Sequence, residues 1–123
     1  MSNFEHSTLV SDLKKSSKEI INELKPEQAD ALHMAIGIAG EAGELLDAIK
    51  KWAIYQKPLD LENVIEELGD LEFYMEGLRQ SLNLTRIETL MENIAKLQKR
   101  YSKGEYSNEQ ANERADKAQS QQK

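Results

Sequence analysis

Apolar residues recur along most of the chain at intervals of three, four and seven positions, which is the spacing of one face of an α-helix. The first such segment begins near Leu9 and must end before Pro26, because proline disfavours helical backbone at the residue before it. Three more segments follow the first. We therefore expect helices over residues 9–25, 26–55, 61–82 and 85–101.

Polar residues with capping ability stand at the expected helix ends. Asp60 is a good N-cap for the third helix, and Thr85 with Glu88 forms a capping box at the start of the fourth. Gly104 can terminate the fourth helix, and Ser107 can cap one more short helical stretch. These residues support the boundaries that the apolar spacing predicts.

Four helices with short connections predict an all-α fold, a four-helix bundle protomer. We expect a single helical domain over residues 1–106, followed by a polar tail over residues 107–123 that is a short helix or disordered. The second helix is apolar on two sides, as in the centre of a bundle or at a subunit interface. Its glycines, Gly37, Gly40 and Gly43, could permit a neighbouring helix to approach closely.

The amino-acid composition excludes several classes of function. The 123 residues contain 16 Lys and Arg against 22 Asp and Glu, so the net charge of −6 argues against binding nucleic acid through its backbone. The absence of cysteine excludes disulfides and thiol nucleophiles. No apolar run approaches the ~20 residues that span a membrane. Residues 1–10 lack the layout of a secretory signal, so we expect a cytoplasmic protein without membrane contact.

Two pairs of carboxylates stand out on the second and third helices. Glu41 and Glu44 form one pair, and Glu67 and Asp70 form the other. A spacing of three residues places both members of a pair on the same helix face. The connection between the pairs is long enough for the chain to reverse, so an antiparallel hairpin would bring them face to face.

Such an arrangement has an electrostatic consequence. Two carboxylates ~5 Å apart repel by roughly 3 kcal/mol at an effective dielectric constant near 20. Several such contacts would exceed what a domain stable by about 5–15 kcal/mol tolerates. Either the groups extend into water on a solvated face, or some are protonated, or a cation lies among them. Carboxylates without imidazole or thiolate suit a hard ion such as Mg2+ or Mn2+.

The residues around these carboxylates resemble a known family. The two runs Gly40-Glu41-Ala42-Gly43-Glu44-Leu45 and Glu66-Glu67-Leu68-Gly69-Asp70 are similar to the Glu-x-x-Glu…Glu-x-x-Asp signature of the MazG-like all-α nucleoside triphosphate pyrophosphohydrolases. Downstream, the chain resembles the family's fourth helix at Asn93-Ile94-Ala95-Lys96-Leu97, Arg100-Tyr101, Gly104 and Tyr106-Ser107. The resemblance covers roughly residues 32–106.

The resemblance implies an enzyme that converts NTP or dNTP and water to the nucleoside monophosphate and pyrophosphate, a reaction suited to housecleaning of the nucleotide pool. It implies Mg2+, with Mn2+ as a substitute, held by Glu41, Glu44, Glu67 and Asp70. Water would then attack the α-phosphate, and Glu66 or Glu67 would accept its proton. The implied assembly is a homodimer or a homotetramer built as a dimer of dimers.

Candidates for binding the substrate are less sharply defined. Lys50 and Lys51 follow Glu44 by about two turns and could reach the β- and γ-phosphates, although a solvated lysine explains each slightly better. Trp52 could stack on a base or pack at an interface. Some family members have an aromatic residue one place earlier, where this chain has Lys51. The remaining candidates are Tyr74, Lys96 and Arg100.

Two other functions compete with this interpretation. A di-iron carboxylate bundle uses Glu-x-x-His pairs on two helices, but here only Asp30 and His33 have a comparable spacing, and no second pair exists. A non-catalytic helical adapter, or a structural dimer with a degenerate metal site, is the second alternative. The presence of all four signature carboxylates argues against degeneration.

Overall fold

The computed structural model describes residues 5–118, which contain helices and no strand. The elements in chain order are α1 (His6–Leu13), α2 (Ser17–Glu23), α3 (Pro26–Ala53), α4 (Leu61–Ser81), α5 (Arg86–Arg100), α6 (Asn108–Glu113) and α7 (Ala115–Ala118). The prediction of an all-α chain is confirmed. Within the described range, no helix combines the length and apolar character needed to cross a membrane.

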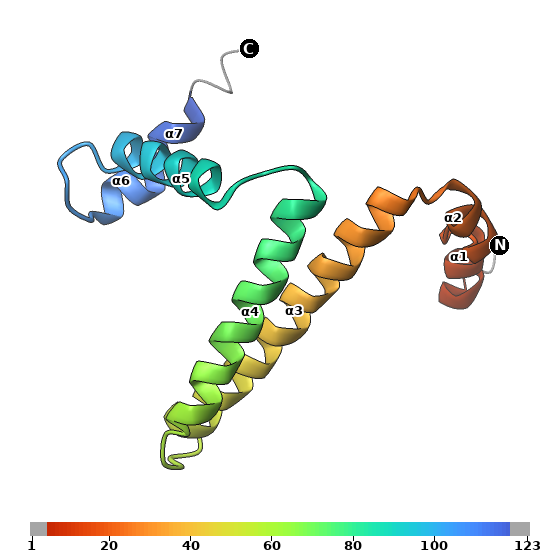
Figure 1. Cartoon of the computed structure of the whole chain (residues 1–123), viewed down its shortest axis with the longest axis horizontal. Coiled ribbons are helices and arrows are strands. Elements are labelled where there is room, and N and C mark those ends of the chain that lie inside the picture. Colours follow the sequence, from red (N-terminus) through yellow and green to blue (C-terminus); the bar gives the residue numbers. More distant parts are fainter. Residues whose placement is uncertain (1–4, 119–123) are drawn as a thin grey trace.

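The central unit is an antiparallel hairpin of the two longest helices, α3 and α4, which lie side by side (Figure 1). Pro26 occupies the first turn of α3, as its fixed backbone angle favours. Asp60 caps α4, because its Oδ1 accepts a hydrogen bond of 3.1 Å from the backbone N–H of Asn63. The second and third predicted helices are thus confirmed, with α3 ending at Ala53 and α4 at Ser81.

Close packing within the hairpin depends on glycine. A Cβ atom on Gly37 of α3 would overlap the ring of Tyr74 on α4, and one on Gly77 would overlap the side chain of Met34. The expected close approach is therefore found at Gly37. At Gly40 and Gly43 an added Cβ would meet nothing within 4 Å, so these two glycines do not serve packing within the chain.

The expectation of one continuous helix before Pro26 is wrong. The chain breaks between α1 and α2, and Ser16 starts the second helix by accepting a hydrogen bond of 3.1 Å from the N–H of Glu19. An ion pair between Lys15 and Glu23 ties the break to the end of α2. The physical reason is local, because Ser16-x-x-Glu19 is itself a helix-start pattern that the apolar spacing concealed.

Helix α5 begins as predicted. The hydroxyl of Thr85 accepts from the N–H of Glu88 at 3.1 Å, and the Glu88 carboxylate accepts from the N–H of Thr85 at 3.4 Å. Yet α5 lies apart from the hairpin and packs instead with α6 and α7 (Figure 1). The described residues of one chain therefore do not form the predicted four-helix bundle. Ala48 is the single apolar residue that is buried in the described part.

The C-terminal segment folds back on α5. Helix α5 ends at Arg100, and Gly104 follows with a left-handed φ of 77° that suits a residue without Cβ. Ser107 caps α6 by accepting a hydrogen bond of 3.1 Å from the N–H of Gln110, as expected. The predicted polar tail thus contains α6 and α7, whereas residues 119–123 lie outside the described residues.

Candidate metal centre

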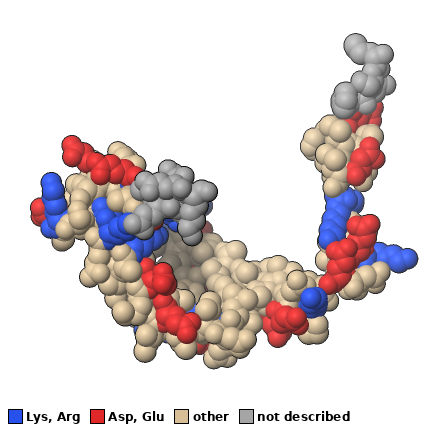
Figure 2. Space-filling view, turned by 90° about the horizontal axis from the view of Figure 1, so that it is seen from above, with Lys and Arg blue, Asp and Glu red and all other residues tan. Residues whose placement is uncertain are grey.

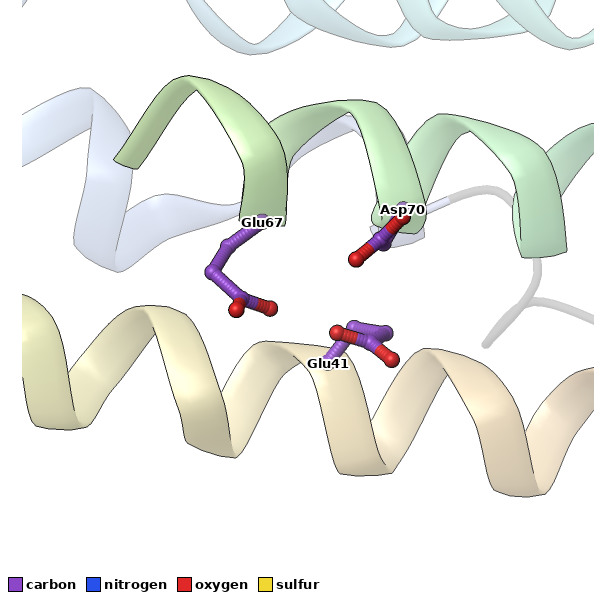
Figure 3. Close-up of side chains that lie close together, drawn as sticks. All are labelled: Glu41, Glu67 and Asp70. Atoms are coloured by element: carbon purple, nitrogen blue, oxygen red, sulfur yellow. The ribbon is translucent and has the colours of Figure 1, made fainter. Parts of the chain in front are cut away.

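Three carboxylates converge between the two helices of the hairpin. Glu41 projects from α3 and meets Glu67 and Asp70 from α4, and one oxygen of each lies within 4.8 Å of the others (Figure 3). Glu41 and Glu67 are half-buried, and Asp70 is exposed. The antiparallel pairing of α3 and α4 produces this meeting, because it places the middle of one helix against the middle of the other.

The proximity of these groups changes their protonation. The pKa of Glu67 is raised from 4.5 to about 7, chiefly because a protonated Glu67 can share a hydrogen bond with Glu41. Partial burial raises it further, and so do the negative charges of Glu41, Asp70 and Glu44. The Oε2 atom of Glu67 is buried and has no hydrogen-bond partner among the described residues. The cluster is therefore costly to ionise fully without a compensating positive charge.

A divalent cation would supply that charge, and the donor set fits one. The converging atoms are carboxylate oxygens, which hard ions such as Mg2+ and Mn2+ prefer. The buried Oε2 of Glu67, which has no hydrogen-bond partner, has a lone pair free to bind a cation. Glu41, Glu67 and Asp70 are the residues that could hold the ion, with its remaining positions open to water or phosphate oxygens.

Two further predicted carboxylates lie beside this cluster. Glu44 lies about one turn after Glu41 on α3 and is exposed; its charge helps raise the pKa of Glu67, but its oxygens are outside the converging set. Glu66 is also exposed and precedes Glu67 on α4, so it points to a different side of the helix. The roles expected for Glu44 and Glu66 stay predictions.

The lysines expected near the phosphates have other partners in this chain. Lys51 forms an ion pair of 2.9 Å with Asp47, and this pairing lowers the pKa of Asp47 and raises that of Lys51. Lys50 places its Nζ 5.5 Å from the centre of the Tyr55 ring. Trp52 is 47% exposed near the end of α3. None of the three is brought into the carboxylate cluster.

Tyr74 lies one turn beyond Asp70 and takes part in helix packing. Its ring covers Gly37 and meets Phe73 edge-on, with the ring centres 5.1 Å apart. His33 lies 6.5 Å from it in a similar edge-on orientation, so His33 belongs to this aromatic contact. The predicted supporting role of Tyr74 is compatible with this position.

Lys96 and Arg100 are carried by α5, which the single chain does not bring to the carboxylates. Arg100 donates two hydrogen bonds to Asp116 of α7. Lys96 lines a groove between α5 and α7. Asp116 is a residue that the sequence did not single out, since it lies far from Arg100 along the chain in a segment of polar composition.

One comparison with known proteins bears on this geometry. A family model described as the MazG nucleotide pyrophosphohydrolase domain matches residues 30–104. This span includes most of α3 together with α4 and α5, and it contains the three converging carboxylates. Searches of curated proteins and of solved structures found no match.

Proposed function

The chain belongs to the MazG nucleotide pyrophosphohydrolase family, and we propose that it hydrolyses nucleoside triphosphates, NTP or dNTP, to the monophosphate and pyrophosphate. The observation that carries the proposal is the convergence of Glu41, Glu67 and Asp70 between α3 and α4. An acidic cluster with an unpartnered buried oxygen is suited to a cation, and a cation there is suited to a polyphosphate.

The roles of Glu41, Glu67 and Asp70 follow from their positions, whereas those of Glu44 and Glu66 rest on the sequence alone. Glu41, Glu67 and Asp70 would hold Mg2+ or Mn2+, with Glu44 beside them. When bound, the ion would supply positive charge against the phosphates and acidify water at neutral pH. Glu66 or Glu67 accepts the proton of the attacking water. The water oxygen bonds to the α-phosphorus, the bond from that phosphorus to the bridging oxygen breaks, and pyrophosphate leaves.

The reaction fits removal of unwanted nucleotides from the cytoplasmic pool, because polymerases cannot use a monophosphate. Lys50, Lys51, Lys96 and Arg100 are the proposed phosphate ligands, and Trp52 is the proposed base contact. Since Lys50 and Lys51 have partners elsewhere in the free chain, their role requires those contacts to break when substrate binds.

We further propose that the working unit is a homodimer or a dimer of dimers. The chain exposes 10418 Å², whereas a compact monomer of 14.0 kDa exposes about 6,700 Å². The difference is far larger than the roughly 800 Å² that each partner contributes to a standard interface. Figure 2 shows an open, curved molecule with broad areas free of Lys, Arg, Asp and Glu.

Apolar side chains occupy both the hairpin and α5. Ile36 of α3 is 62% exposed, Ile65 of α4 is 62% exposed and Ile87 of α5 is 72% exposed. A second copy would cover these residues and supply the core that the described part of one chain lacks. Such an assembly also gives α5 of one copy, with its Lys96, a route to the carboxylates of another.

The proposed activity is tested with a panel of NTPs and dNTPs in Mg2+, following release of monophosphate and pyrophosphate. Glu41→Gln and Asp70→Asn should each lower kcat/KM by about 100-fold or more, because each removes a charged ligand from the cluster. Glu72→Gln is the matched control, since Glu72 is an exposed acid of α4 two residues from Asp70 and on another side of the helix.

The outcomes separate the alternatives. Release of orthophosphate in place of pyrophosphate would contradict the proposed bond cleavage. Equal turnover by Glu41→Gln, Asp70→Asn and the wild type would show that these carboxylates take no part in catalysis. If no nucleotide in the panel were hydrolysed, the non-catalytic adapter would become the better interpretation.

A further inference from the structure

A nearly buried ion pair joins α5 to the C-terminal helix α7. Arg100 donates from Nε to Oδ1 of Asp116 at 2.8 Å and from Nη2 to Oδ2 at 3.2 Å. The two side chains are 17% and 5% exposed, respectively. This two-point contact uses the same face of the guanidinium with which arginine binds the oxygens of a phosphate group.

The segment that delivers Asp116 lies beyond the residues that match the family model. The family match ends at residue 104, whereas α6 and α7 cover residues 108–118. Helix α7 spans only Ala115–Ala118, and a helix of one turn is not stable by itself. Its attachment to α5 therefore depends on contacts such as that between Arg100 and Asp116, and loss of this contact would weaken the attachment.

The ion pair borders a groove of about 520 Å³ between α5 and α7. Lys96, Lys99 and Lys117 contribute to its lining, as do the acids Glu92 and Asp116. The Arg100 guanidinium lowers the pKa of Asp116, so this acid is ionised at neutral pH. Asp116 therefore accepts hydrogen bonds from the two Arg100 nitrogens that a phosphate group would otherwise use.

We propose that Asp116 is an internal competitor for Arg100, and that α6 and α7 form an autoinhibitory strap which a phosphate-bearing ligand displaces from α5. The ligand class is a nucleotide polyphosphate or pyrophosphate. The physiological meaning of the strap rests on the proposed function, because the hydrolase would then be held in a low-affinity state until polyphosphate is abundant. Binding to α5 itself requires neither metal nor turnover.

The test measures the affinity of the full chain for inorganic pyrophosphate by calorimetry, with EDTA present so that the carboxylate cluster holds no ion. If the strap is closed in about nine of ten molecules, Asp116→Asn should bind pyrophosphate about tenfold more tightly. Glu113→Gln is the matched control, since it removes the same charge from an exposed position of α6 and should change the affinity little.

Two additional measurements make the result decisive. In an Arg100→Gln background, Asp116→Asn should no longer increase the affinity, because the contested guanidinium is absent. In the wild type, pyrophosphate should increase amide hydrogen exchange over residues 108–118. The proposal is overturned if Asp116→Asn binds pyrophosphate equally or more weakly, which would make Asp116 a structural or positioning partner. It is also overturned if pyrophosphate leaves exchange in the strap unchanged.

These results are independent of the catalytic assay. If the protein hydrolyses no nucleotide but Asp116→Asn binds pyrophosphate more tightly, the strap proposal stands and the proposed function is contradicted. If the protein is an active pyrophosphohydrolase but Asp116→Asn does not change its affinity for pyrophosphate, the proposed function stands and the strap proposal is contradicted.

Discussion

Glu41 and Glu67 face each other from neighbouring antiparallel helices, and their carboxylate oxygens approach within 4.8 Å in a cluster completed by Asp70. The pKa of Glu67 is raised to about 7, chiefly by hydrogen bonding with Glu41 and then by partial burial and the neighbouring negative charges. Near neutral pH the site therefore exists in two forms. In one form Glu67 holds a proton, and in the other the ionised carboxylates can bind a cation.

The stability of the metal-free protein should fall as the pH rises from about 5 to 8. Between pH 4.5 and about 7 the folded state keeps a proton on Glu67 that the unfolded state has lost. Because the native state then binds more protons, the free energy of unfolding decreases with pH over this window. Urea unfolding in EDTA at a series of pH values measures the slope.

The Glu67→Gln variant isolates this effect. It should flatten the slope and be more stable than the wild type at pH 8, since the neutral amide avoids the repulsion from Glu41. Glu66→Gln removes the adjacent exposed charge and should keep the wild-type slope. An unchanged pH dependence in Glu67→Gln would show that another group controls it.

Mg2+ or Mn2+ should raise the unfolding temperature, and by more at pH 8 than at pH 6. A ligand that binds only the folded state stabilises it by about 2.7 kcal/mol at a hundredfold excess over Kd. Protons compete with the ion for Glu67, so the effect weakens as the pH falls through about 7. Scanning calorimetry with and without the ion gives the shift, and an equal shift in Glu41→Gln would mean that the ion binds elsewhere.

Gly37→Ala should destabilise the hairpin, whereas Gly69→Ala should not. A Cβ on Gly37 would overlap the ring of Tyr74, and overpacking of this kind costs about 1–3 kcal/mol. At Gly69 an added Cβ meets nothing within 4 Å, so alanine should add about 1 kcal/mol of helix propensity. The free energy of unfolding in urea measures both effects, and equal effects would contradict the close contact between Gly37 and the Tyr74 ring.

The long helices were predictable because their determinants are local. Apolar spacing and the caps Asp60 and Thr85 specify α3, α4 and α5 closely, and the family resemblance is confirmed by the match over residues 30–104. The break before α2 was missed although Ser16-x-x-Glu19 marks it. Apolar spacing continued through the break and outweighed the cap in the sequence-based interpretation.

Non-local relationships were less accessible from sequence. Spacing of three residues indicated which acids share a helix face, but it did not show that Glu41 would meet both Glu67 and Asp70 while Glu44 stayed outside the converging set. The pairing of Arg100 with Asp116 follows no local pattern. An apolar stripe such as that of α5 predicts burial without identifying the surface that covers it.

The wild-type protein should sediment with at least twice the 14.0 kDa chain mass, whereas the Ile94→Glu protein should sediment as a monomer. Ile94 is 47% exposed on α5 between Leu90 and Leu97, which are 43% and 40% exposed, so a charge there enters the middle of the apolar stripe. A carboxylate buried without a partner is expensive, and dissociation avoids that cost. Analytical ultracentrifugation measures the mass, and circular dichroism reports any accompanying loss of helix.

Gln80→Glu is the control for that experiment, because it adds the same charge at an exposed polar position of α4 and should leave the assembly intact. Dissociation by Ile94→Glu alone would indicate that a second copy covers α5. A wild-type chain that sediments as a monomer would mean that the exposed residues of α3, α4 and α5 are covered within the chain by a rearrangement in solution. An Ile94→Glu protein that remains a dimer would place the interface on the hairpin, away from α5.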